Sequence, residues 1–155
     1  MENIASPARG VLTRSFAFIS LAAAAFLSGA NLRLFDSLLP SVALDFNVPP
    51  TTAAIVVTTF TFAYGLFQIV YGPLGDRIGK MRIAGLATIC ASIASIGSAL
   101  APTLHILAFL RFLTGMGIAA VIPMSLAWIG DKSSYETRQA TLGRFVGFLL
   151  LGQVM

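Results

Sequence analysis

Three ionisable residues stand inside long apolar stretches of this sequence: Arg33, Asp36 and Arg111. A charge at bilayer depth costs at least ~2.5–3.5 kcal/mol on insertion scales, so it is kept where it faces a cavity or a partner. Asp36 is the one carboxylate within such a stretch, which makes it the candidate for reversible protonation. Burial raises the pKa of a carboxyl group and a nearby cation, Arg33 or Arg111, lowers it. Alternatively, Arg33 and Asp36 neutralise each other at i and i+3.

Arg111 has two interpretations of its own. It lies several residues inside an apolar stretch, so it either faces a cavity and tunes the proton affinity of a nearby carboxylate, or forms a structural ion pair. Snorkelling to the outer headgroups is a variant of the second interpretation.

A charged, glycine-rich segment runs from residue 72 to residue 82 and separates two apolar stretches. Its glycines are expected to allow a tight chain reversal and close helix contact. Further along the chain, Asp131 and Glu136 are possible partners for the basic residues of this segment, or are ordinary loop acids. The segment's residues that could form charge contacts or shape the turn are Gly72, Asp76, Arg77, Gly79, Lys80 and Arg82.

The composition indicates a membrane protein. Of 155 residues, 57% are hydrophobic and only 10% charged, whereas a soluble domain carries about a quarter charged residues. The apolar residues form blocks near the ~20 residues that a span needs. The sequence therefore predicts an all-α polytopic membrane protein with a loose cytoplasmic tail at 1–13. Spans are expected at about 16–42, 53–71, 83–100 and 104–129, with an incomplete fifth at 142–155.

Several local features refine this prediction. A signal peptide is the alternative for the first stretch, but the helical pattern continues and further spans follow. Thr51 or Thr52 is expected to cap the second span. Tyr64, Gln68 and Gly72 share one helical face, where they line a cavity or pack against a neighbour. The small residues of the third span predict a helix packed tightly inside the bundle, and Gly143-x-x-x-Gly147 is a weak packing signal.

Charge sets the expected orientation and excludes other functions. With the N-terminus in the cytoplasm, the loops on that side carry Arg or Lys and the two outer loops carry none, which is the positive-inside pattern. The net charge of +4 is spread between the apolar blocks, so nucleic-acid binding is not expected. Cys90 is the single cysteine, which excludes a disulfide framework. We find no metal spacing, cofactor motif or catalytic triad, and expect no enzyme. The cytoplasmic basic residues are Arg9, Arg14, Arg77, Lys80, Arg82, Lys132, Arg138 and Arg144.

Three segments resemble the major facilitator superfamily of secondary transporters. The segment at 72–82 looks like the family's loop G-x-L-a-D-R-x-G-R/K-R/K between helices 2 and 3, with Met81 departing at the second basic position. Arg111, Gly115 and Gly117 are similar to the R-x-x-x-G-x-G-x-A pattern of helix 4. Asp36 and Pro40, with Arg33 before them, resemble more weakly the first helix of drug-efflux proton antiporters.

The resemblance implies that the chain is the N-terminal part of such a transporter, covering about a third of a twelve-helix member. It implies proton-coupled efflux of small molecules or drugs by alternating access, with Asp76 in a cytoplasmic gate. It also implies a multi-pass location in a cell membrane, such as the bacterial inner membrane, with lipid, protons and substrate as partners. The missing C-terminal helices would be needed for transport. A non-transporting membrane remnant and a small dimeric four-helix exporter are the alternatives.

Overall fold

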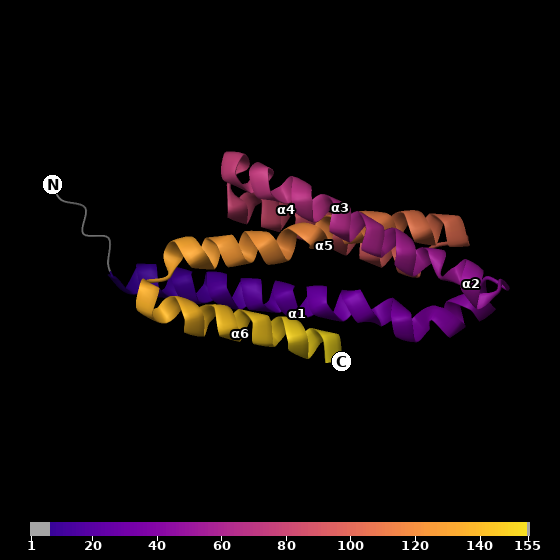
Figure 1. Ribbon diagram of the computed structural model, residues 1–155, viewed down its shortest axis with the longest axis horizontal. Coiled ribbons are helices and arrows are strands. Elements are labelled where there is room, and N and C mark those ends of the chain that lie inside the picture. Colours follow the sequence, from indigo (N-terminus) through magenta and orange to yellow (C-terminus); the bar gives the residue numbers. More distant parts are fainter. Residues whose placement is uncertain (1–6, 155) are drawn as a thin grey trace.

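The computed structural model describes the backbone of residues 7–154 and the side chains of residues 18–154. Apart from a few linking residues, this part of the chain is helical and has no strand. Four helical segments are long and apolar enough to cross a membrane: Phe18–Asp45, Pro50–Ile78, Lys80–Ala99 and Leu104–Lys132. This confirms the predicted fold class. The helices are α1 (Pro7–Asp45), α2 (Pro50–Ala53), α3 (Ile55–Ile78), α4 (Lys80–Ala99), α5 (Leu104–Lys132) and α6 (Tyr135–Val154) (Figure 1).

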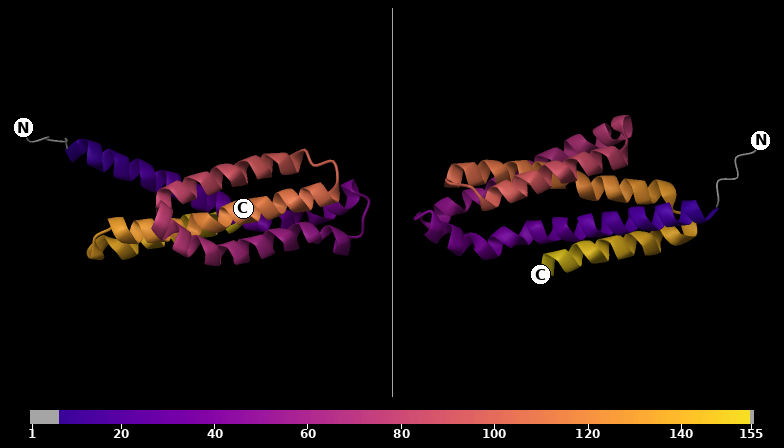
Figure 2. Two further views of the ribbon diagram at one scale, coloured as in Figure 1. Left: turned by 90° about the horizontal axis from the view of Figure 1, so that it is seen from above. Right: turned by 180° about the vertical axis from the view of Figure 1, so that it is seen from behind.

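Helix α5 is the centre of the arrangement. Helices α3 and α4 pack along it, while α1 and α6 pack on each other as a separate pair that also contacts α5. The ribbon accordingly divides into an α3–α4–α5 group and an α1–α6 pair (Figure 1). The two further views show the same pairing of α6 with α1 and place the α3–α4 and α5–α6 connections toward the N-terminal end (Figure 2).

The helix ends differ from the predicted spans in the charged segments. Residues 7–13, expected to be loose, belong to α1, and residues 1–6 of that predicted tail lie outside the described part. Helix α6 begins at Tyr135 rather than near 142, so only two residues separate it from α5, fewer than the predicted spans at 104–129 and 142–155 leave between them. Polar residues therefore continue the helices beyond the apolar blocks, because a helix end outside the hydrocarbon needs no apolar side chains.

The predicted turn at 72–82 is also wrong in extent. Helix α3 continues through Gly72 and Pro73 to Ile78, and α4 begins at Lys80. Gly79 alone separates them, with φ 107°, a conformation that side-chain-bearing residues rarely adopt. The glycine that reverses the chain is therefore Gly79, while Gly72 lies within a helix.

One smaller prediction fails, and another is met on one side of its helix. Neither Thr51 nor Thr52 caps the second span, since Pro49 stands at the N-cap and makes no side-chain hydrogen bond. Helix α4 packs tightly through its small residues on one side only. Its other side leaves large apolar side chains uncovered by the described part of the chain: Leu86, Ile89, Ile93 and Ile96.

Glycines bring the helices together at three crossings. A Cβ on Gly115 would fall on the carbonyl oxygen of Phe60 in α3, and one on Gly117 would lie 2.5 Å from the carbonyl oxygen of Ala87 in α4. At the third crossing, Gly29 of α1 and Gly152 of α6 each meet the other helix's backbone in the same way. Such residues let helix backbones approach closely in lipid. The signal at Gly143 and Gly147 marks no such contact, since both face open space.

Candidate functional site

Arg111 is the largest fully buried side chain in the described part, with 1% of its surface exposed. It lies two turns into α5 and points across to α1 and α3. Its guanidinium carbon is 4.1 Å from the ring centres of both Phe35 and Phe60. The guanidinium thus sits between two aromatic faces, each of which attracts a desolvated cation by up to about 2 kcal/mol.

Asn31 of α1 supplies the polar partners of this cation. The two terminal nitrogens of Arg111 donate to the Asn31 side-chain oxygen (3.4 Å) and to its backbone carbonyl (3.3 Å). The remaining donor, Nε, has no partner in the described part. Buried donors are nearly always paired, so the free Nε–H indicates that a hydrogen-bond partner is missing from the described part of the chain.

No carboxylate in the described part of the chain forms an ion pair with Arg111. Among residues 18–154 the ion pairs are Arg33–Asp36 and Lys80–Asp131. Asp36 lies close enough to Arg111 for a coulombic interaction without forming an ion pair. Breaking a buried charge away from its partners is costly, and here those partners are an amide, a carbonyl and two rings. Arg111 therefore does not form the structural ion pair that was one of its two interpretations from the sequence.

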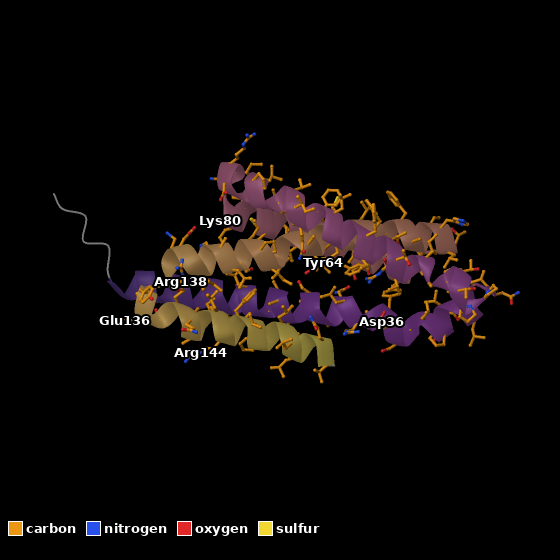
Figure 3. The ribbon with its side chains drawn as sticks, in the orientation of Figure 1. Asp36, Tyr64, Lys80, Glu136, Arg138 and Arg144 are labelled. Atoms are coloured by element: carbon orange, nitrogen blue, oxygen red, sulfur yellow. The ribbon has the colours of Figure 1, made fainter. Side chains whose placement is uncertain are left out.

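Asp36 faces outward and pairs with Arg33. Their closest atoms are 3.5 Å apart, and the side chains are 47% and 66% exposed, respectively. The i, i+3 neutralisation considered from the sequence is thus present. A pair this open contributes little by itself, so Asp36 stays accessible to protons in the described part of the chain. Figure 3 shows Asp36 in the half of the molecule away from the α5–α6 connection.

Tyr64 and Gln68 lie one turn apart on α3, and their side chains are hydrogen-bonded to each other. Tyr64 is half-buried, and its ring is stacked near that of Phe60, with centroids 6.2 Å apart. It therefore lies next to one of the two rings that contact Arg111. Gln68, one turn on, is exposed. Gly72 has open space around it in the described part of the chain, so only Tyr64 and Gln68 of these three residues contact each other.

A small hollow of about 260 Å³ lies between α1, α4 and α5. Its polar lining comes from Ser28 and Asn31 of α1 and from Thr88, Ser92 and Ser95 of α4. Asn31 therefore touches both this hollow and Arg111. The residues expected to line a cavity, Asp36, Tyr64 and Gln68, take no part in it.

The charged end of the molecule contains one close contact between helices. Lys80, the first residue of α4, donates to the carboxylate of Asp131 in the last turn of α5 at 2.5 Å. This is one of the pairings that the sequence left open. Asp76 and Arg77 are exposed and, like Arg82 and Glu136, form no ion pair among the side chains that the structure describes. Nearby, Gly75 is buried under the sulfur of Met124.

Sequence reasoning missed Asn31, Phe35 and Phe60 as partners of Arg111. Asn31 gave a weak signal, because it is an amide inside an apolar stretch. The aromatic residues gave none, since phenylalanine is common throughout the spans. Gly115 and Gly117 were found as a motif, and the structure shows that they face two different helices.

Comparison with known proteins places the chain in a family. A family model described as Major Facilitator Superfamily matches residues 21–155. The chain is 28% identical to the uncharacterized MFS-type transporter YybF of Bacillus subtilis, over 91% of the chain and 33% of that protein. It is 29% identical to the multidrug transporter AQR1 of Candida glabrata (86% of the chain, 22% of that protein).

A further relative is the lincomycin resistance protein of Streptomyces lincolnensis, at 27% identity over 92% of the chain and 31% of that protein. The chain thus spans a third or less of the length of these relatives. Because the family match covers most of the chain, this chain belongs to the major facilitator superfamily.

Proposed function

We propose that this chain is the N-terminal part of a secondary transporter that exports small, drug-like molecules across a cell membrane by alternating access. The observation that carries the proposal is Arg111, a cation buried between three spans with only neutral partners. A charge in this position is a functional site by default. Relatives named as a multidrug transporter and as a lincomycin resistance protein support export of a drug-like molecule.

Proton coupling is assigned to Asp36. Its carboxylate is open to solvent and paired loosely with Arg33, and Phe35, the preceding residue, touches Arg111. Protonation of Asp36 would remove the negative charge nearest to Arg111 in this part of the fold. The free Nε of Arg111 would then bind an acceptor on the substrate or on the rest of the transporter. Proton binding and substrate binding would in this way alternate at one place.

The gate is assigned to the charged end. Lys80 and Asp131 join the first turn of α4 to the last turn of α5. Asp76 and Arg77 form no ion pair in the described part of the chain, so they can pair with helices outside it. A gate must open as well as close, and a surface ion pair of this kind contributes little to stability. Such a weak contact can be broken in every transport cycle.

The test is proton-driven drug efflux by the complete protein in inverted membrane vesicles, with and without a protonophore. Asp36→Asn is expected to abolish the protonophore-sensitive part of transport, and Arg111→Gln to abolish transport at normal expression. Asp45→Asn, an exposed carboxylate at the far end of α1, is the control and should transport normally. Retention of protonophore-sensitive efflux by Asp36→Asn would refute the coupling assignment, and full activity of Arg111→Gln would refute the site.

A further inference from the structure

Two hollows meet on one side of the α1–α6 pair. The first, of about 330 Å³, lies where the ends of α5 and α6 approach α1, and its lining includes Lys132, Ser133, Arg144 and Trp128. The second, of about 520 Å³, runs between α1 and α6 and is lined by apolar side chains only, among them Phe26, Phe148 and Leu151. Phe18 and Ile19 line both. The two hollows are therefore one groove with a basic end and an apolar body.

The basic end lies at the depth of the lipid headgroups. Lys132 is the last residue of α5, and Arg144 immediately precedes the apolar run 145–152 of α6. Trp128, beside them, is the residue type that collects at the membrane–water boundary. Figure 3 shows Arg144 in the same half of the molecule as Lys80, Arg138 and Glu136. The apolar body then extends from this boundary toward the hydrocarbon.

The two cations of the groove have no direct ion-pair partner in the described part, although Lys132 lies close enough to Asp131 for a coulombic interaction. Neither Lys132 nor Arg144 forms an ion pair or a side-chain hydrogen bond within residues 18–154. The acids nearby do not supply one, because Asp131 is bound by Lys80 and Glu136 has no ion pair to either. Arg138 directs its guanidinium to the carbonyl of Gly130, at 2.6 Å. Two cations without an ion pair next to an apolar groove are complementary to an amphiphile with an anionic head.

We propose that this groove binds an anionic glycerophospholipid. Its phosphate lies between Lys132 and Arg144, with the Ser133 hydroxyl as a further donor, and one acyl chain follows α1 and α6 along Phe26 and Leu151. Basic pockets between spans on the cytoplasmic side are suited to such headgroups, and each cation near an anionic surface strengthens binding by about fivefold. A zwitterionic lipid lacks the net charge, so the site discriminates by headgroup. The proposal does not depend on the transport assignment.

The test is native mass spectrometry of the complete protein, purified in detergent and incubated with equal amounts of phosphatidylglycerol and phosphatidylcholine. The wild type is expected to retain phosphatidylglycerol preferentially. Lys132→Gln combined with Arg144→Gln should lower that retention by about 25-fold, the product of two fivefold losses. The matched control, Arg77→Gln combined with Arg82→Gln, removes two exposed cations elsewhere at the charged end and should leave retention unchanged.

A third variant tests the acyl groove. Ala23 is exposed and lines the apolar hollow, so Ala23→Phe fills it without touching either cation. It should reduce phosphatidylglycerol retention, while size-exclusion profiles show that all variants stay folded. Equal retention of both lipids, or unchanged retention in the Lys132/Arg144 double variant, would overturn the proposal. A disulfide formed efficiently between Ile19→Cys and a cysteine in another helix of the complete protein would assign the groove to that helix instead.

Discussion

Replacing Gly115 by alanine should loosen the contact between α3 and α5. The added Cβ would fall on the Phe60 carbonyl oxygen, and it would also lie 3.1 Å from the Phe60 carbonyl carbon and 3.2 Å from its Cα. All three atoms are backbone, so no rotamer change relieves the overlap. The helices must separate by a fraction of an ångström along their crossing. Phe60 also holds one face of Arg111, so the displacement reaches the buried cation.

The magnitude follows from two opposing effects. Alanine in place of glycine favours a helix by roughly 0.5–1 kcal/mol. Overpacking of a tight contact costs about 1–3 kcal/mol. Because the overlap here is with backbone atoms, its cost lies in the upper part of that range. Gly115→Ala should therefore destabilise the folded state by about 1–2 kcal/mol net. Gly143 is also helical and has no atom within 4 Å of a built Cβ, so Gly143→Ala should be neutral or slightly stabilising.

Thermal unfolding of the purified protein in detergent, followed by circular dichroism and by the fluorescence of Trp128, measures the difference. Gly115→Ala should unfold several degrees below the wild type, and Gly143→Ala at or above it. A drug-efflux assay at permissive temperature should show the Gly115 variant impaired as well, since Arg111 is displaced. If the two variants had equal stability, the close approach of α3 to α5 at Gly115 would be refuted.

Three further predictions concern other contacts. Lys80→Glu and Asp131→Lys should each lower the unfolding temperature slightly, because surface ion pairs contribute little, and the double variant should recover most of that loss in a double-mutant cycle; additive losses would contradict the ion pair. Gly152→Ala should separate α1 from α6 and lower the unfolding temperature, whereas Gly147→Ala, which faces open space, should not. Gly79→Ala should cost about 1–3 kcal/mol because the residue at φ 107° becomes strained, and an unchanged unfolding temperature would contradict that backbone conformation.

The sequence predicts four helices long and apolar enough to cross a membrane, and the structure contains them, but the sequence does not predict where the helices end. Apolar blocks near twenty residues give the spans, because lipid demands both helix and apolar surface. Helix ends lie outside the hydrocarbon, where lipid imposes no constraint and the helix propensity of the local residues determines them. Thus 72–78 looks like a glycine-rich loop in sequence, yet it continues α3, since a glycine inside a helix costs only about 1 kcal/mol and Gly75 gains a contact with Met124.

The partners of Arg111 show the corresponding limit for the candidate site. A buried cation suggests a carboxylate, and Asp36 was the one available in the spans. The structure instead surrounds the guanidinium with Asn31, Phe35 and Phe60. Carbonyls and aromatic rings leave no signature in sequence, because every residue has a carbonyl and phenylalanine serves equally well against lipid. A pattern of residue types finds the cation but not its surroundings.

The spacing within the helix-4 motif explains why α5 is the central helix. Residues two apart on an α-helix point about 200° from each other, so Gly115 and Gly117 open opposite sides of α5, one to Phe60 of α3 and the other to Ala87 of α4. Arg111 lies four residues before Gly115, on the side that faces α3 and α1. The glycine that lets α3 approach therefore also sets the distance between Phe60 and the guanidinium. A movement of α3 relative to α5 cannot leave the buried cation unchanged, and this couples the packing of the bundle to the site that we assign to transport.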